Sequence, residues 1–271
     1  MPMKPLASQL LANTSIRFGA GVLGLLLLIA GLAPWMGTVD PAAMDSGHIN
    51  TLSGTVGTFA LLDGTSVAHT FWMGSDNFGR DIYSRVLYGT RVSLLVGLFT
   101  ALAALLVGGT LGMLAGYFRA VDAVLMRFMD GLMAIPAILL AIALVAALGA
   151  QLWTVVVAIA VPEIPRVTRL VRSLVLSLRE EPFVEAARAL ATPTPVILWR
   201  HILPNAMAPL IVQGTFIAAS AVLTEAILSF LGLGLPADIP TWGNIMAEGR
   251  VQFSQYPGNV LYPALFLVPT V

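Results

Sequence analysis

Few side chains in this chain could do chemistry. There is no cysteine, which excludes a thiolate nucleophile, a disulfide framework and an iron–sulfur site. The only lysine is Lys4, so the chain has no phosphate-binding loop ending in Gly-Lys-Ser/Thr, and any nucleotide energy would have to come from another subunit. His48 and His69 have no third ligand at metal-site spacing, and we interpret them as ordinary loop residues. The sequence therefore predicts neither a catalytic site nor a metal site.

The remaining candidates are charged residues within or beside apolar segments. Glu225 interrupts one such segment; it is either a functional carboxylate inside the membrane or a group at the outer interface, paired or solvated. Glu163, Arg166, Arg169 and Arg172 follow another apolar segment. The arginines either lie at the cytoplasmic interface or line the cytoplasmic mouth of a pathway. We take Arg166, Arg169 and Glu225 as the pathway or gating candidates.

The composition is that of a membrane protein. Of the 271 residues, 58% are hydrophobic and only 10% are charged, and the mean hydropathy is +0.88. The formal net charge is zero, which gives no reason to expect a nucleic-acid partner. Long uncharged runs separated by polar loops predict an all-α integral membrane protein that contacts lipid.

The apolar runs predict six transmembrane helices. About 20 residues span the hydrocarbon core. We therefore place the second crossing at 92–118 and the third at 131–148. The fourth begins near 152, the fifth ends near 231 and the sixth begins at 257. The full division is a tail (1–17), a first transmembrane helix (18–39), an external loop with a short amphipathic helix and strands around 55–62 (40–91), and a membrane core (92–271) that includes a cytoplasmic loop (173–204) and an external loop (236–256).

Charge orients these segments. Basic residues precede the first apolar run, whereas Asp40 and Asp45 follow it, which places the N-terminus in the cytoplasm. Six arginines between Arg166 and Arg200 place that segment on the same side. The last apolar run, Pro257–Val271, has only 15 residues, and a terminal carboxylate inside hydrocarbon would be costly. We therefore expect the sixth helix to be truncated here and the natural protein to continue.

Small residues mark a close helix contact in the second crossing. Gly108, Gly112 and Gly116 recur at four-residue intervals, which lets another helix approach closely. That helix belongs either to this subunit or to a neighbouring one.

The segment Phe183–Asn205 is a polar interlude between long apolar runs. Pro182 suits the first position of a short amphipathic helix, and Glu185 suits its positive end. The run 192–195, with prolines at every second position, ends that helix. A second short helix is expected from Pro195, and Leu203-Pro204 is expected to turn the chain into the next apolar run.

Glu185-Ala186-Ala187, with Ile202-Leu203-Pro204 downstream, resembles the EAA motif of ABC importer permeases. In that family the loop docks into a groove of a cytoplasmic ATPase. The usual glycine of the motif is Ala191 here; alanine has poor access to left-handed dihedrals, which affects the expected bend more than the role. The resemblance implies that Phe183, Ala186, Ala187 and Leu190 fill the ATPase groove, with Glu185 and Ala191 completing the coupling segment.

Two further stretches resemble the dipeptide/oligopeptide/nickel family of these permeases. Residues 74–85, which lead into the second predicted helix and are called the lead-in motif, are similar almost letter for letter to the segment before the second helix of C-type subunits. The following residues 89–94 continue this similarity. Within the lead-in motif, Asp81 and Arg85 are four residues apart and are expected to pair. The stretch 224–235 is also similar. The lead-in residues singled out are Asp76, Gly79, Arg80, Asp81 and Arg85.

The resemblance covers roughly residues 71–250 and implies a type I ABC permease fold, with a five-helix core after an N-terminal helix. The implied function is a non-catalytic transport subunit of an ATP-driven importer for di- or oligopeptides or related small solutes, in the bacterial inner membrane. The chain itself would bind no cofactor, since ATP and Mg would sit on the partners. Those partners would be a B-type permease, two ATP-binding subunits and an external solute-binding protein.

One alternative from another class is a proton-coupled secondary transporter that uses Glu225 and Glu163 as carriers. Uptake that collapses with the proton gradient while ATP is maintained would favour it. The substrate itself is not encoded in any motif of this chain.

Overall fold

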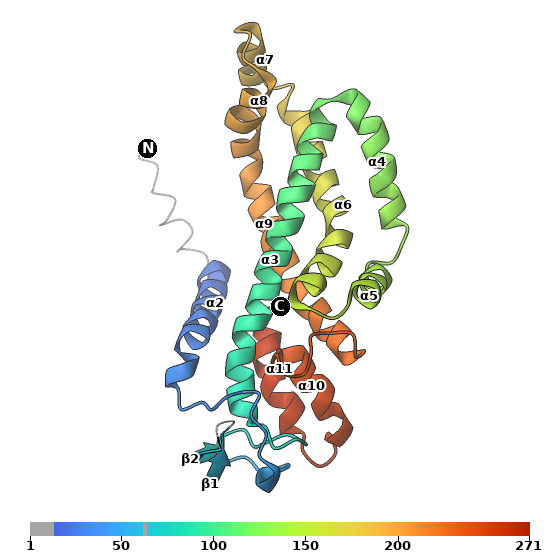
Figure 1. Cartoon of the computed structure of the whole chain (residues 1–271). Helices are drawn as coiled ribbons and strands as arrows, with labels where there is room; N and C mark the ends of the chain where they lie inside the picture. The colour runs from blue at the N-terminus through green and yellow to red at the C-terminus, as the bar shows by residue number, and fades with distance from the viewer. Residues whose placement is uncertain (1–13, 62–63) are drawn as a thin grey trace, which may run out of the picture. The chain divides into compact units, whose positions relative to one another are not determined.

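The computed structural model describes residues 14–61 and 64–271, most of which are helical (Figure 1). Most of the expected tail 1–17 lies outside the described residues. The chain divides into two compact units, one made of Met1–Leu94 with Ser229–Val271 and the other of Leu95–Leu228. Two long helices, α3 (Ile82–Tyr117) and α9 (Leu203–Phe230), contribute to both units.

The first unit combines helices with a small hairpin. Its antiparallel strands pair Thr55 with Phe71 and Ala60 with Ser66, close to the strands expected around 55–62. Ala43, Phe59 and Phe71 form the hairpin's buried core. The elements are α2 (Thr14–Leu32), η1 (Ala33–Trp35), η2 (Ser46–His48), β1 (Thr55–Ala60), β2 (Ser66–Phe71), the beginning of α3, the end of α9, α10 (Trp242–Gly249), η4 (Arg250–Gln252) and α11 (Gly258–Thr270).

The first transmembrane helix ends earlier than expected. We predicted residues 18–39, but α2 ends at Leu32 and a short 3-10 turn with Pro34 follows. The guanidinium of Arg91, on α3, donates to the carbonyls of Ala30 and Gly31, the latter at 3.2 Å. An arginine near a helix C-terminus satisfies carbonyls that lack a partner within the helix. Arg91 thus ties the end of α2 to α3.

The external loop also ends earlier than expected. Helix α3 begins at Ile82, so residues 82–91 are its first turns and not a separate amphipathic helix. The start is set by Asp81, whose carboxylate accepts a hydrogen bond from the Ser84 amide at 2.7 Å, as an N-cap residue does.

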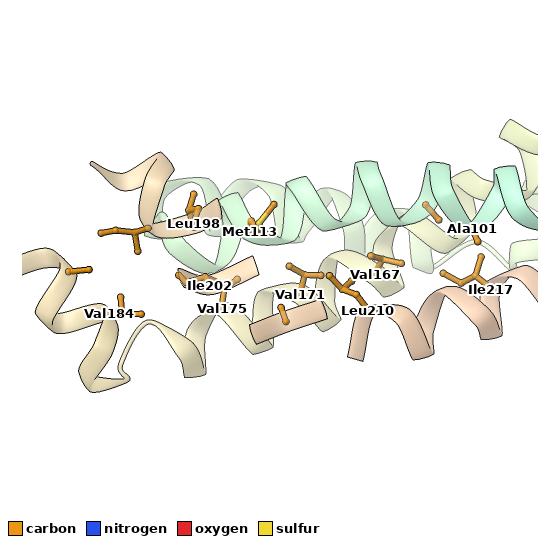
Figure 2. Close-up of a cluster of buried hydrophobic side chains, with 14 residues drawn as sticks. Ala101, Met113, Val167, Val171, Val175, Val184, Leu198, Ile202, Leu210 and Ile217 are labelled. Atoms are coloured by element: carbon orange, nitrogen blue, oxygen red, sulfur yellow. The ribbon is translucent and has the colours of Figure 1, made fainter. Parts of the chain in front are cut away.

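The second unit is a helix bundle. Besides parts of α3 and α9 it contains α4 (Arg119–Met133), α5 (Ala137–Leu148), α6 (Leu152–Leu178), α7 (Pro182–Ala189), α8 (Thr194–Val196) and the π-helix η3 (Ile197–Ile202). Its hydrophobic core runs along α3, α6 and α9 and reaches Val184 on α7 (Figure 2).

The glycine face of α3 packs against α6 of the same chain. A Cβ at Gly112 would lie 2.6 Å from Val171 Cβ and 2.7 Å from the Thr168 carbonyl, too close for any larger residue. Gly108 and Gly116 meet Val167 and Val175 in the same way. The contact therefore lies within the subunit, which decides between the two interpretations of these glycines.

Two expected crossings can be compared in detail with the structure. The segment 131–148 is broken at Pro136, because proline disfavours helix in the preceding residue; α4 and α5 are bent by 87° there. Conversely, α6 continues through Pro162 and Pro165. By length and composition, the described part of the chain has three helices able to cross a membrane, or four with the bent pair, so the count of six stays a prediction.

The expected turn at Leu203-Pro204 does not occur. One helical segment continues from Thr194 to Phe230, and a π-helical stretch, Ile197–Ile202, immediately precedes the predicted turn.

Candidate functional site: the coupling segment

Helix α7 begins where the sequence predicted. Glu181 has extended dihedrals, Pro182 occupies the first turn, and Glu185 places a negative charge at the positive end of the helix dipole. The first turn bonds back to the flanking residue, with the Val184 amide donating to the Glu181 carbonyl at 2.9 Å. A proline start and a favourable charge together give a short helix a defined N-terminus.

Helix α7 ends in a Schellman motif built on alanine. Ala191 has a φ of 56°, in the left-handed region. The Thr192 amide donates to the Ala187 carbonyl at 3.0 Å, and the Ala191 amide to the Arg188 carbonyl at 2.9 Å. These are the two bonds of that motif. The structure settles the bend that the missing glycine had left open, since Ala191 adopts the conformation that glycine would take.

One face of α7 is buried in its own subunit. Val184 and Ala187 belong to the hydrophobic core of the second unit, together with residues of α6 and η3 (Figure 2). Ala187 is only 6% exposed. Our expectation that Ala187 enters a groove on another protein is therefore wrong, because its side chain already packs inside this chain.

The other residues of the coupling segment are exposed. Leu190 is 81% exposed and Phe183 is 39% exposed, and Glu185, Ala186 and Ala191 are exposed as well. On the helix that follows, Trp199 is 67% exposed. We call Phe183, Ala186, Leu190 and Trp199 the exposed apolar set. Trp199 was not among the predicted site residues, although a tryptophan beside an arginine in a polar interlude was a usable signal.

The arginines of α6 are paired. Arg166 donates to Glu163 at 3.0 Å and Arg169 to Asp130 at 2.6 Å. Arg172 makes a two-point contact with Asp122, one bond being 2.7 Å. Asp122 and Asp130 lie on α4, so the pairs that they make with Arg172 and Arg169 fasten α4 to α6. The Arg166–Glu163 pair lies within α6. Pairing with acids accounts for arginines at this position without a pathway role.

Glu225 lies on α9 and is 1% exposed, and Glu163 is also buried. Burial excludes the interpretation of Glu225 as a solvated group at the outer interface.

The lead-in motif forms a buried ion network in the first unit. Asp76 binds the Arg80 side chain at 2.6 Å, and Arg80 also contacts Glu248. Arg85 donates to the Ala237 carbonyl at 3.1 Å and to Glu248 at 3.4 Å. Both arginines are almost fully buried. The network thus joins the start of α3 to α10 and to the loop before it.

The predicted Asp81–Arg85 pair does not form. Asp81 instead caps α3 and lies 3.4 Å from His69 Nε2. The partner of Arg85, Glu248, was missed because the sequence does not show which distant acid meets a buried arginine. Burial raises the pKa of Glu248, against the opposing effect of Arg85 and Arg80.

Gly79 has a structural role in the same network. Its φ is 76°, and a Cβ there would lie 1.9 Å from the Asp45 carbonyl oxygen. Only glycine tolerates both the dihedral and the contact.

Comparison with known proteins identifies the family. Residues 108–271 match the family described as binding-protein-dependent transport system inner membrane component. The chain belongs to this family. The permease is 46% identical, over 94% of its length and 83% of the relative's, to a probable peptide ABC transporter permease of Sinorhizobium fredii. It is 40% identical, over all of its length and 84% of the relative's, to the dipeptide transport system permease DppC of Alkalihalophilus pseudofirmus.

A third relative is the glutathione transport system permease GsiD of Pectobacterium atrosepticum, 42% identical over 78% of the permease and 70% of the relative. Among solved structures, the inward-facing MetNI methionine ABC transporter matches with a TM-score of 0.54 and 20% identity. That match covers 68% of the permease and 88% of the solved chain, and it confirms the ABC type I permease fold. Nothing in these comparisons supports the proton-coupled alternative. The permease is a non-catalytic, multi-pass membrane subunit of an ABC transporter.

Proposed function

We propose that this permease forms half of the translocation pathway of an ATP-driven importer of di- or oligopeptides or related small solutes. The support is the agreement among relatives, which are named for peptide, dipeptide and glutathione transport. A family described as binding-protein-dependent supports import, because an external binding protein delivers solute.

The complete machine would contain a second, B-type permease, two cytoplasmic ATPases and an external solute-binding protein. ATP and Mg would bind to the ATPases and not to this chain. The complex would lie in the bacterial inner membrane, with the N-terminus of this chain in the cytoplasm. The chain's own contribution would be alternating access, driven through its coupling segment.

The observation that carries this role is the two-sided character of α7. Val184 and Ala187 fix one side in the core of the second unit, whereas Phe183 and Leu190 are exposed. Burying an exposed leucine or phenylalanine in a partner contributes about 1.5–3 kcal/mol. A short helix with defined ends, held in its own core, would transmit movement of an attached ATPase to α6 and α9.

The test uses Leu190→Asp in the reconstituted complex. We expect normal assembly of the chain in the membrane but loss of peptide-stimulated ATP hydrolysis and uptake, because a charge would enter an apolar groove. The matched control is Ala189→Ser, a small change at an exposed residue of the same helix that lies outside the exposed apolar set. Normal uptake by the Leu190→Asp variant at wild-type expression would contradict the proposal.

Two further variants separate a loss of docking from a loss of folding. Glu185→Lys, at an exposed position, should impair coupling without preventing insertion, since it reverses a charge in the coupling segment. Ala187→Asp places an unpaired charge in the core and should destabilise the chain by several kcal/mol. Detergent thermal stability should therefore fall for Ala187→Asp and stay unchanged for Glu185→Lys. The reverse order would show that we have assigned the two faces of α7 wrongly.

A further inference from the structure

We propose that Pro204 is a positioning residue for coupling: it imposes the π-helical turn that sets which side chains of residues 194–202 face outward. The inference rests on the proposed coupling function, and it adds a residue outside α7 that controls how the exposed apolar set is presented.

The physical cause lies in the backbone of Pro204. Proline has no N–H to donate to the carbonyl four residues earlier, and its ring clashes with that carbonyl. Here that carbonyl is Arg200, inside the π-helix Ile197–Ile202. A π-helix joins residues five apart, so the bond that Pro204 cannot make is not needed.

A side chain supports the widened turn. The Asn205 amide group donates to the His201 carbonyl at 2.6 Å. The chain is helical on both sides, from Thr194 and as far as Phe230. The irregularity is therefore confined to one turn immediately before the proline.

The π-turn determines which residues face the core. Ile197 and Ile202 are five residues apart and are both essentially buried, while Trp199 between them is exposed. In an α-helix, at about 100° per residue, residues five apart would point about 140° away from each other. Ile197 could not then share a face with Ile202, and Trp199 would turn toward the core.

This turn is joined to α7 through the core. Ile197 and Ile202 belong to the same buried cluster as Val184 and Ala187 (Figure 2 labels Ile202 and Val184). The phase of η3 therefore fixes where Trp199 lies relative to the exposed residues of α7.

The first experiment measures helix phase directly. The chain has no cysteine, so Ile197→Cys and Trp199→Cys can be labelled singly with a maleimide in the full chain in membranes, before any ATPase is added. With Pro204 present, position 199 should label rapidly and position 197 slowly. Adding Pro204→Ala restores the missing N–H, and labelling of 197 should rise to the level seen at 199, while 199 becomes protected.

Pro209 supplies the matched control. It also lies inside the helix, but in the α-helical part of α9. Pro209→Ala should leave labelling at both positions unchanged. An unchanged pattern in the Pro204→Ala background would overturn the inference, whatever the effect on transport.

The second experiment asks whether phase matters for coupling. Pro204→Ala alone should reduce peptide-stimulated ATP hydrolysis. Deleting the exposed Arg200 in that background puts Ile197 four residues before Ile202, which restores the phase in a continuous α-helix. Coupling should then recover, with Arg200→Ala in the wild-type background as the control for loss of the arginine itself.

The outcomes separate this inference from the proposed function. Failure of the deletion to rescue coupling, with the labelling phase restored, would overturn the positioning role of Pro204. If Leu190→Asp and Pro204→Ala both leave ATP hydrolysis coupled, the docking role of the segment is wrong too. Loss of coupling in Leu190→Asp but not in phase-shifted Pro204→Ala would overturn only the role of Pro204.

Discussion

At the scale of single residues, Ala191 carries a measurable strain. A non-glycine residue in the left-handed region costs roughly 1–2 kcal/mol, and Ala191 has a φ of 56°. The two Schellman hydrogen bonds at the end of α7 compensate for it. The helix therefore ends at a defined residue even though alanine replaces the glycine usual in this motif.

Replacing Ala191 by glycine should stabilise the end of α7. We expect a gain of up to about 1 kcal/mol, because the relief of strain exceeds the extra entropy that glycine loses on folding. Amide hydrogen exchange of residues 187–192 measures this directly. As a control, Ala189→Gly inside the helix should speed exchange, and faster exchange in the Ala191→Gly variant would contradict the assignment.

Asp45 gives the β1–β2 hairpin a dependence on pH. Burial acts to raise its pKa, but hydrogen bonds from the Ala60 amide, His48 and the Gly47 amide outweigh burial and lower the pKa. A depressed pKa adds stability that is complete above the unfolded value, near 3.8, and is lost as the pH falls through the folded value.

We therefore expect strand β1 to lose protection below about pH 4. Hydrogen exchange of the β1 amides, corrected for the intrinsic effect of pH, would measure the loss. In an Asp45→Asn variant protection should be lower at neutral pH and nearly independent of pH. A wild-type hairpin with equal protection from about pH 6 to about pH 3 would be inconsistent with this role.

At the scale of elements, the α3–α6 contact depends on the absence of side chains. A Cβ at Gly112 would lie 2.6 Å from Val171 Cβ. A Cβ at Gly109, on the same helix, would have no neighbouring atom within 4 Å. Gly112→Leu should separate α3 from α6. The overpacking should lower the free energy of unfolding by about 1–3 kcal/mol, which is measured as a loss of thermal stability in detergent. Gly109→Leu should leave it nearly unchanged, and equal losses in the two variants would contradict the packing.

The sequence predicted these elements unevenly, for identifiable reasons. The start of α7 followed from Pro182 and Glu185, because capping and charge act locally. Pro136 was overlooked as a break, whereas α6 continues as a helix through Pro162 and Pro165. Whether a proline interrupts a helix depends on what else satisfies the backbone, which tertiary packing decides.

Site prediction failed where orientation or a distant partner was needed. The motif identified α7, but only the packed core shows that Ala187 points inward. Likewise, Arg80 and Arg85 were recognised, while Glu248, more than 160 residues later in the chain, was not. A buried arginine requires an acid or carbonyl, but the sequence alone offers several.

At the scale of the whole molecule, family membership follows from the order of several motifs more than from any one of them. The EAA-like segment and the lead-in are far apart in sequence and lie in different units of the structure. Each carries its own chemistry, an exposed apolar set in one and a buried ion network in the other. Their common role as parts of one transporter is therefore visible only at the level of the complete chain.

The orientation of the chain in the membrane is the remaining prediction at this scale. Cytoplasmic segments are enriched in Lys and Arg, and residues 166–200 contain six arginines, whereas 40–79 contain neither residue type. Single cysteines at Leu190 and Val56, both strongly exposed, report the side directly because the wild-type chain has none. In intact cells that express the chain without its ATPases, a membrane-impermeant maleimide should label position 56, and position 190 only after permeabilisation. Labelling of position 190 in intact cells would reverse the topology and remove the coupling segment from the reach of a cytoplasmic ATPase.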